Sequence, residues 1–349
     1  EAPAREASFF DGIDTTLPGL YRALRRTPPA GAEAALGAID GELAAAVGSF
    51  RMAEPSASAP ALARALAATR SALRQPGGDP DVVSVLSVKE EQIQEAIAAA
   101  LGISFSAMAQ PAGTVEPTGP GAAFARPAAM PPVVPGQAFQ VKTTFVNRSP
   151  VAVAGVRISL ETKEPWGQPA DAPPRDAPAN VPLAARFDLT VPRTAPLTRP
   201  WFTRPGIQET RYAVADQAAL YRPAAEPALV AAARFEVDGV PVTIREPVRR
   251  LEANLPYGFD TRVLAVVPPI GITVDPAQAV VPLGMSRKQV TLRTEVLNNV
   301  EGKSEGTVRL AAPVGWTVEP ASQPFSFGRA GERGRCACTV TIPSPEGRG

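Results

Sequence analysis

The sequence predicts a multidomain α plus β protein, in which a small N-terminal helical bundle precedes two immunoglobulin-like antiparallel β-sandwich domains. Its 349 residues exceed the size at which one hydrophobic core keeps growing. The spacing of apolar residues changes along the chain from a period of about 3.6 to a period of about 2, and most of the 40 prolines follow Gln110. We therefore expect a helical bundle over 1–108, a Pro- and Gly-rich linker over 109–130, a first β-sandwich over 131–268 and an immunoglobulin-like β-sandwich over 269–345.

The N-terminal region is alanine-rich and has three long stretches with helical spacing. Residues 32–50 carry apolar side chains at every third or fourth position, which predicts one amphipathic helix. A second stretch ends at the Pro-Gly-Gly of 76–78. A third begins at Asp79-Pro80, an N-cap residue followed by proline at the first helical position, and runs to Leu101. With a short helix around 17–25, these helices predict a bundle, because each apolar face needs the others to be buried.

Alternation of apolar and polar residues predicts the strands of the two β-sandwiches. In the first sandwich the alternation covers 139–145, 156–160 and 185–191. The clearest hairpin turns at Asp238-Gly239, because both central residues of such a turn need positive φ. In the second sandwich the expected strands cover 270–274, 290–297, 307–310, a segment with Phe325 and Phe327, and 336–342.

The composition argues against a catalytic role for this chain. It contains no histidine, although histidine is the usual general base near neutral pH and the commonest zinc ligand. Its 35 basic and 34 acidic residues nearly cancel, so no overall field attracts nucleic acid. No apolar run reaches the ~18 residues of a membrane-spanning helix. We therefore expect no catalytic residue, no metal ligands, no cofactor, no nucleic-acid partner and no membrane span.

Two features leave other chemistry open. An enzyme that relies on carboxylates alone would need two Asp or Glu side chains to converge in one cleft. Cys336 and Cys338 lie two residues apart in an expected strand, so both face one side of it, and a disulfide between them would be strained. We expect two partly buried free thiols.

One proline-rich segment combines aromatic and cationic side chains, which are the residue types that stack on sugars and bind anions. The predicted carbohydrate-binding residues are Trp201, Phe202, Tyr212 and Tyr221, interleaved with Arg199, Arg204, Arg211 and Arg222. The alternative is an ordered loop that packs on the sandwich or on another domain. Trp316 follows Gly315 in the last domain, and we expect it to fill the sandwich core, with sugar stacking as its alternative role.

Several segments resemble the region that follows the catalytic domain in large bacterial deacetylases of the PIG-L (LmbE-like) family. They are Phe9–Thr15, Lys89–Ala96, Leu101–Ile103, Pro135–Ser149, Arg199–Phe202 and Phe235–Val242. The last domain is similar to the Ig-like domain found beside alpha-galactosidase catalytic domains, through Pro313–Pro320 and Val340–Pro343. The resemblance covers nearly the whole chain and includes no catalytic fingerprint.

The resemblance implies a parent protein that removes an acetyl group from an N-acetylated sugar with a zinc ion held in an upstream catalytic domain. That family holds zinc with a His-Pro-Asp-Asp segment and a His-x-x-His pair, and this chain contains neither. We therefore expect a non-catalytic accessory region that positions the enzyme or holds it near polysaccharide, with the catalytic domain of the same polypeptide as its partner. The implied location is periplasmic or secreted. The alternative is a stand-alone carbohydrate-binding or adhesive cell-envelope protein.

Overall fold

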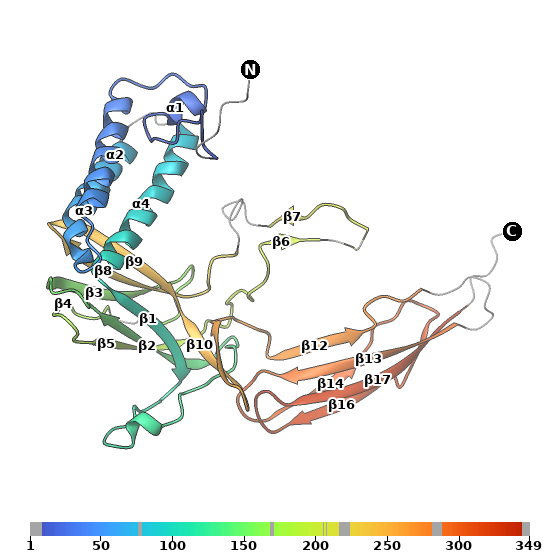
Figure 1. Ribbon diagram of the computed structural model, residues 1–349. Helices are drawn as coiled ribbons and strands as arrows, with labels where there is room; N and C mark the ends of the chain where they lie inside the picture. The colour runs from blue at the N-terminus through green and yellow to red at the C-terminus, as the bar shows by residue number, and fades with distance from the viewer. Residues whose placement is uncertain are drawn as a thin grey trace.

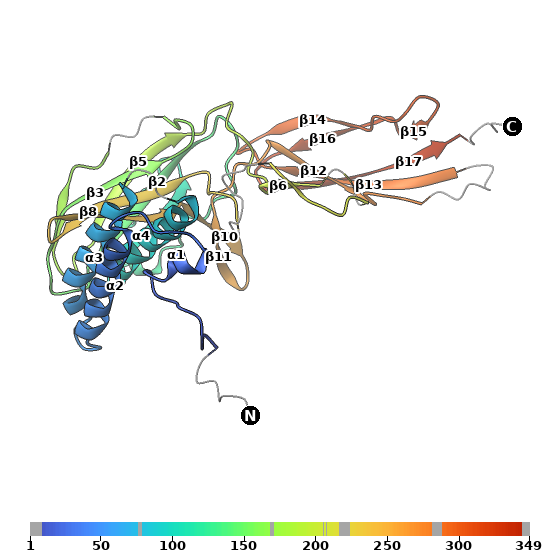
Figure 2. The same cartoon turned by 90° about the horizontal axis from the view of Figure 1, so that it is seen from above.

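The computed structural model describes residues 9–75, 79–167, 171–204, 206, 208–215, 224–280 and 288–343. Within these ranges the protein is mostly β-strand, with a small helical region at the N-terminal end (Figure 1). The helices pack over one end of a first β unit, and a second β unit continues the molecule away from them, so that the chain has an elongated outline in both views (Figure 2). No helix among the described residues is long and apolar enough to cross a membrane.

The helices follow the predicted order, with bounds α1 Leu20–Ala23, α2 Ala32–Ser49, α3 Ala59–Leu73 and α4 Pro80–Ala100, and a 3-10 turn η1 over Pro55–Ser58. Helix α4 begins as predicted, because the Asp79 side chain caps it by accepting a hydrogen bond from the Asp81 N–H at 2.9 Å. Helix α1 is shorter than the predicted 17–25. It ends early because Arg25 adopts a positive φ of 55°, which is incompatible with an α-helix.

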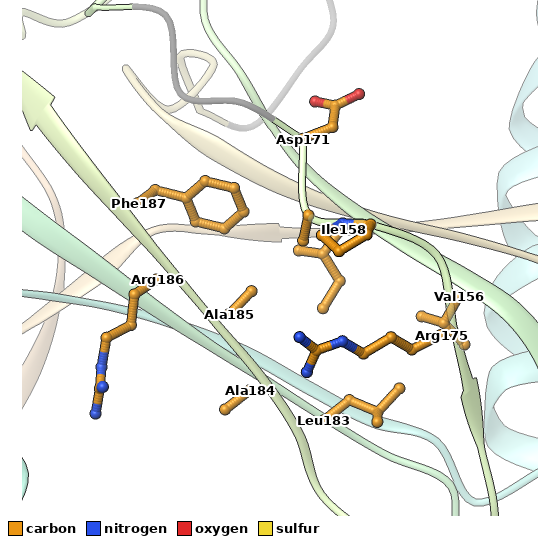
Figure 3. A pocket seen from close by; sticks show the side chains of 11 residues that line it. Val156, Ile158, Asp171, Arg175, Leu183, Ala184, Ala185, Arg186 and Phe187 are labelled. Atoms are coloured by element: carbon orange, nitrogen blue, oxygen red, sulfur yellow. The ribbon is translucent and has the colours of Figure 1, made fainter.

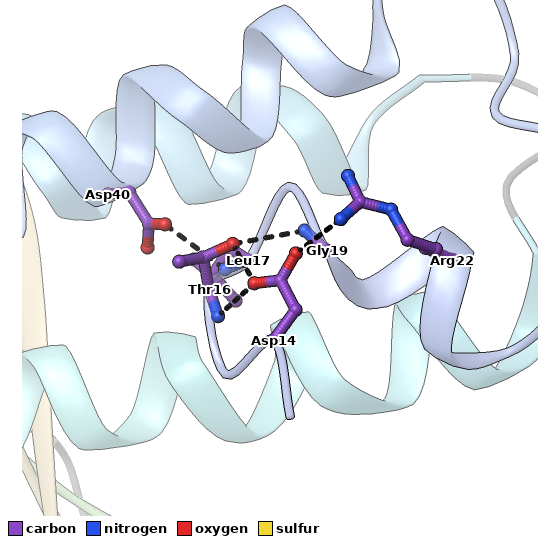
Figure 4. Close-up of polar contacts among 6 residues, drawn as sticks. All are labelled: Asp14, Thr16, Leu17, Gly19, Arg22 and Asp40. Atoms are coloured by element: carbon purple, nitrogen blue, oxygen red, sulfur yellow. Dashed lines mark hydrogen bonds and ion pairs between the residues drawn. The ribbon is translucent and has the colours of Figure 1, made fainter. Parts of the chain in front are cut away.

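A polar cluster ties the segment before α1 to α2 (Figure 4). The Asp14 carboxylate accepts hydrogen bonds from the Thr16 hydroxyl at 2.6 Å and the Thr16 N–H at 3.1 Å, and it pairs with Arg22 at 3.0 Å. Asp40 of α2 accepts a hydrogen bond from the Leu17 N–H at 3.1 Å. The hydrogen bonds from Thr16, helped by the charge of Arg22, hold the pKa of Asp14 below its ordinary value.

The first β unit consists of two sheets that enclose a common core. One sheet has the order β11-β10-β1-β2-β5, and the other has the order β4-β3-β8-β9. All pairs are antiparallel except β1 with β10. The strands are β1 Ser104–Pro111, β2 Ala138–Val146, β3 Val153–Glu161, β4 Arg175–Ala177, β5 Leu183–Thr190, β8 Val230–Val237, β9 Val240–Pro247, β10 Arg249–Asn254 and β11 Gly258–Val263.

Strand β1 corrects the predicted boundaries, because it lies partly in the range 1–108 assigned to the bundle and partly in the predicted linker 109–130. After Gly102, which has a φ of 59°, the chain turns directly from α4 into the sheet. The buried positions of β1 are Phe105 and two alanines, Ala107 and Ala109. A short run rich in alanine resembles the alanine-rich helices before it, so the sequence did not indicate a strand here. One continuous core therefore joins α3 and α4 to both sheets, and includes Leu66, Ile97, Phe145 and Phe235.

The predicted hairpin at Asp238-Gly239 is confirmed. Both residues have positive φ, 48° and 74°, and Val237 pairs with Val240 across the turn. Glycine has no Cβ, and aspartate tolerates the left-handed region better than most residues, so this dipeptide adopts the turn at low cost. The hairpin places the start of β9 against α3 and α4.

The second β unit packs a four-stranded sheet, β12-β13-β17-β15, against a two-stranded sheet, β14-β16. The ring of Phe327 approaches β17 at Gly334, where a side chain would contact it at 3.2 Å. Cys336 and Cys338 are half-buried free thiols, as predicted. The strands are β12 Ile270–Asp275, β13 Lys288–Asn298, β14 Ser304–Arg309, β15 Thr317–Glu319, β16 Ser322–Phe327 and β17 Arg333–Ile342.

In each β unit, a buried asparagine lies at the C-terminal end of a strand and bonds to the backbone of the turn that follows: Asn147 after β2 and Asn298 at the end of β13. The Asn147 amide donates to the carbonyls of Val151 and Ala177, and the Asn298 amide donates to three backbone carbonyls, that of Arg329 among them at 2.9 Å. Both side chains are fully buried. Each asparagine satisfies carbonyls that the turn leaves without a strand partner, so the same device recurs in both units.

Candidate functional site

Three of the four predicted carbohydrate-binding residues form one aromatic cluster. They lie on a hairpin made by β6 Phe202–Thr203 and β7 Ala213–Val214, which pair in antiparallel register. The ring centroids of Trp201 and Phe202 are 5.5 Å apart, and those of Phe202 and Tyr212 are 4.9 Å apart, both edge to face. The sequence brought Trp201 and Phe202 together by adjacency, whereas Tyr212 reaches them only because the hairpin folds back.

An arginine completes this cluster. The Arg204 guanidinium carbon lies 5.8 Å from the centroid of the Tyr212 ring, which is cation–π geometry. The Arg204 Nε also donates to the Gly206 carbonyl at 3.1 Å, which helps to fix the side chain over the ring. Arg199 and Arg211 are exposed on the same hairpin. We call Trp201, Phe202, Arg204 and Tyr212 the aromatic hairpin cluster.

The aromatic hairpin cluster is accessible from solvent. Phe202 is 38% exposed and Tyr212 is 58% exposed, and the hairpin projects away from both sheets of the first β unit (Figure 1). Its base is firmly attached, because Thr198 bonds to Val266 through two hydrogen bonds of 2.8 and 2.9 Å. Trp201 is half-buried, and the alternative that this segment packs on the sandwich or on another domain stays a prediction. Tyr221 and Arg222 lie outside the described residues.

A groove between α4 and β9 is lined by three carboxylates, those of Glu91, Glu95 and Glu246. It has a volume of about 470 Å³, and Glu95 of α4 and Glu246 of β9 are among its lining residues. Burial raises the pKa of Glu246, the neighbouring Glu95 raises it further, and Arg249 opposes them. Glu95 and Glu246 are thus two carboxylates that meet in one groove, as a carboxylate-only enzyme would require.

The other polar groups of that groove make structural contacts instead. Gln94 accepts hydrogen bonds from the Thr243 N–H at 2.8 Å and from Arg70 at 3.1 Å. Arg245 pairs with Glu161 at 2.8 Å. These bonds join the helices to the hairpin β8–β9, so the groove is best described as the junction between the two. No group of three or more Cys, Asp or Glu side chains that could hold a metal ion occurs among the residues that the structure describes.

Trp316 does not fill the core of the second β unit, and that prediction is wrong. Its side chain is 37% exposed and lines a cleft of about 300 Å³ between the two sheets, beside Val274, Leu292 and Ile342. The two-stranded sheet covers only part of the four-stranded one, so the facing side chains are mostly half-buried. The indole therefore lies at the edge of the sandwich, where its alternative role in stacking on a sugar stays available.

The helical region also exposes apolar side chains. Val47 is 78% exposed and Phe50 is 48% exposed, and both line a hollow of about 470 Å³ between α2, α3 and α4. In the segment before α1, Phe9 is 89% exposed and Ile13 is 60% exposed. The sequence predicted Val47 and Phe50 as part of a buried helix face. Both residues lie at the C-terminal end of α2, where Val47 is in its last turn and Phe50 is the C-cap residue.

Comparison with known proteins adds no relative to this description. No protein-family model matches the chain, and no curated protein is significantly similar to it.

Proposed function

We propose that this chain is a non-catalytic accessory region that holds an enzyme near polysaccharide through the aromatic hairpin cluster. The observation that carries the proposal is the grouping of Trp201, Phe202 and Tyr212 with Arg204 on a projecting hairpin. Aromatic rings supply the apolar faces on which the C–H groups of a pyranose stack. Arginine supplies fixed donors for hydroxyl or carboxylate oxygens at the edge of the sugar.

The exposure of these rings supports a binding role. Large aromatic side chains that gather on the surface commonly mark interaction sites. The cluster makes little contribution to the core, because none of its members belongs to the buried residues that join the two sheets. Its local hydrogen bonds and ring contacts nevertheless hold it in one geometry, so a ligand would meet an ordered surface with a reduced entropy cost.

The parent enzyme in this proposal is a PIG-L-type zinc-dependent deacetylase, and both β units belong to its Ig-like accessory part. The zinc and its ligands belong to the catalytic domain of the same polypeptide. The exposed apolar side chains on the helical region, Phe9, Ile13, Val47 and Phe50, support contact with such a neighbouring domain. The proposal includes a periplasmic or secreted location, where a polysaccharide partner would be found.

The second candidate is a stand-alone carbohydrate-binding or adhesive protein of the cell envelope. The same aromatic hairpin cluster favours it, because sugar binding needs no attached enzyme. The reading frame upstream of Glu1 separates the two candidates. The two histidine-containing motifs in that frame would support the accessory role, and their absence would favour the stand-alone protein.

Affinity electrophoresis of the purified chain in gels that contain neutral and acidic polysaccharides tests sugar binding. The double variant Phe202→Ala/Tyr212→Ala should lose retardation, with an affinity about tenfold weaker or more, since each ring contributes on the order of 1 kcal/mol. Tyr257→Ala is the matched control, because Tyr257 is an exposed aromatic on the β10–β11 turn. Equal retardation of all three proteins would contradict the proposal.

A separate experiment tests the proposal that this chain is non-catalytic. The purified chain should release no acetate from an N-acetylated oligosaccharide, with or without added zinc. Zinc-stimulated turnover by homogeneous protein would refute it.

A further inference from the structure

The first β unit has an open side that forms a separate cleft. Strands β5 and β4 are the edge strands of the two sheets, and the cleft lies between β5 on one wall and β3 with β4 on the other (Figure 3). Its volume is about 460 Å³. Pockets that bind small molecules usually have volumes of about 300–1,000 Å³, so this cleft is large enough for a ligand.

The floor of the cleft is apolar. Val156 and Ile158 of β3 and Phe187 of β5 line it, and their side chains are only 2, 4 and 3% exposed. Leu183 and Ala185 complete the wall on the β5 side (Figure 3). The three buried side chains close the bottom of the cleft, whereas the half-buried Leu183 and Ala185 offer the apolar surface that a ring of C–H groups can contact.

A single guanidinium is directed into this apolar cleft. In Figure 3 the Arg175 side chain extends from β4 over the middle of the cleft toward Ala185. Among the described residues Arg175 has no hydrogen-bond or ion-pair partner. Arg186 points away from the cleft and lies 3.6 Å from Glu116, and the Asp171 carboxyl at the rim also points away. The exposed Arg175 guanidinium is therefore the cation that faces the cleft, and it can pair with an anionic group there.

The β5 wall adds hydrogen-bonding groups. Strand β5 has β2 on one side and no strand on the other. The Ala185 carbonyl lies toward β2, where it accepts a hydrogen bond from Thr143 at 3.3 Å. Because backbone groups alternate in direction along a strand, those of Ala184 and Arg186 lie on the open edge. Donors and acceptors thus follow one side of the cleft.

We propose that this cleft binds a carboxylate-bearing saccharide, such as a uronic acid residue of a polysaccharide. The carboxylate binds the Arg175 guanidinium through two parallel hydrogen bonds. The C–H face of the pyranose lies on the half-buried Leu183 and Ala185, and its hydroxyls bond to the open edge of β5. The choice of a saccharide rests on the proposed function, whereas the preference for an anionic group rests on Arg175.

Titration calorimetry of the full chain with a galacturonic acid trimer tests this proposal, with a galactose trimer as the uncharged comparison. We expect measurable binding of the acidic trimer and binding at least about tenfold weaker for Arg175→Gln, since bonds to charged groups are the stronger class. Arg157→Gln is the matched control, because Arg157 is exposed on β3 between Val156 and Ile158 and so faces away from the cleft. Arg175→Lys keeps the charge without the fork and should fall between the two.

A second variant fills the cleft and leaves its charge in place. Ala185→Phe should abolish binding of the acidic trimer, and thermal melts of every variant verify that it is folded. If Arg175→Gln does not fold, Ala185→Phe and Arg175→Lys carry the test. Equal affinity of wild type, Arg175→Lys and Ala185→Phe would overturn the proposal. Binding of an extended acidic peptide in place of the saccharide would also overturn it and would assign the open β5 edge to strand addition.

The outcomes for the cleft and for the aromatic hairpin cluster are separable. Loss of binding only on Phe202→Ala/Tyr212→Ala, with Arg175→Gln unchanged, refutes the cleft and leaves the proposed function standing. Loss only on Arg175→Gln, with the hairpin variant unchanged, supports the cleft and refutes the role of the aromatic hairpin cluster.

Discussion

Replacing Gln94 by leucine should separate the unfolding of the helices from that of the first β unit. Gln94 lies on α4 and is 6% exposed. Its Oε1 accepts hydrogen bonds from the Thr243 N–H at 2.8 Å and from Arg70 Nη2 at 3.1 Å. Arg70 of α3 also donates to the Pro241 carbonyl at 2.5 Å and pairs with Glu90 at 2.6 Å. One amide oxygen thus joins α3, α4 and β9.

The size of the effect follows from the groups left without a partner. Leucine fills a comparable volume but accepts no hydrogen bond, so the Thr243 N–H loses its acceptor. An unsatisfied buried donor costs about 1–3 kcal/mol, and a bond to a charged group contributes about 1.5–3 kcal/mol. Because Arg70 reaches solvent, part of its loss is recovered by water. We therefore expect the helices to lose about 2–4 kcal/mol of stability against urea.

Two signals in one urea titration measure this separation. Circular dichroism at 222 nm follows the helices. With Trp201 and Trp316 replaced by phenylalanine, the fluorescence of Trp166, which is 4% exposed, follows the first β unit. With a slope of about 3 kcal/mol/M, the helical midpoint should fall by roughly 1 M while the fluorescence midpoint moves less. In the wild type the two midpoints should coincide, because one core spans both parts.

Gln92→Leu is the control for this experiment. Gln92 is exposed on α4 and accepts a hydrogen bond from Lys89 at 3.0 Å. The free energy of unfolding of Gln92→Leu should therefore differ from that of the wild type by no more than about 0.5 kcal/mol. Equal shifts for the two variants would refute the view that the amide of Gln94 couples the helices to the β unit.

Four further predictions follow from local geometry. Gly19→Ala would place a Cβ 2.3 Å from the Asp14 carboxyl, so the pKa of Asp14, measured by NMR titration, should rise toward its ordinary value; an unchanged pKa would contradict this. Gly41→Ala, where nothing lies within 4 Å, should stabilise α2 by up to about 1 kcal/mol in thermal melts, since helical glycine is costly. Burial raises the pKa of Glu246, so the protonated side chain stabilises the fold below the pKa of the unfolded chain, and this stabilisation is lost as the pH rises through the folded pKa. Glu246→Gln should therefore raise the melting temperature at pH 7 but not at pH 4. An equal rise at both pH values would exclude burial of the charge as the cause. Asn298→Ala should destabilise the second β unit by about 2–3 kcal/mol, seen as earlier proteolysis of that unit, because its buried carbonyls lose their donors.

The strands and the main helices could be predicted because their signals are local. Alternation marks β2 and β5 along their own length, and Asp238-Gly239 specifies a turn through two neighbouring residues. The capping by Asp79 likewise needs only a bond to Asp81. Strand β1 was missed because alanines supply its inward positions, and alanine carries little information about period.

The sites could be predicted only in part, because they depend on contacts between distant residues. Composition indicated the aromatic hairpin cluster, and the pairing of Phe202 with Val214 placed Tyr212 beside it. Nothing local connects Gln94 to Thr243, or Arg175 to Phe187. Such pairs arise from how the sheets and helices pack, and a single sequence contains no periodic signal for them.

The strongest physical argument for a binding role of the aromatic hairpin cluster is that its Phe202 and Tyr212 rings are exposed, whereas the rings that stabilise the fold are buried. The shared core buries Phe145 and Phe235 edge to face at 5.8 Å, and these rings contribute to folding through the area they remove from water. The ring pair of Phe202 and Tyr212 has comparable geometry but remains exposed. Substitutions there should therefore change ligand binding and leave the melting temperature nearly unchanged, whereas Phe145→Ala should cost about 3–5 kcal/mol of stability. A large drop in melting temperature on Tyr212→Ala would assign the hairpin a structural role instead.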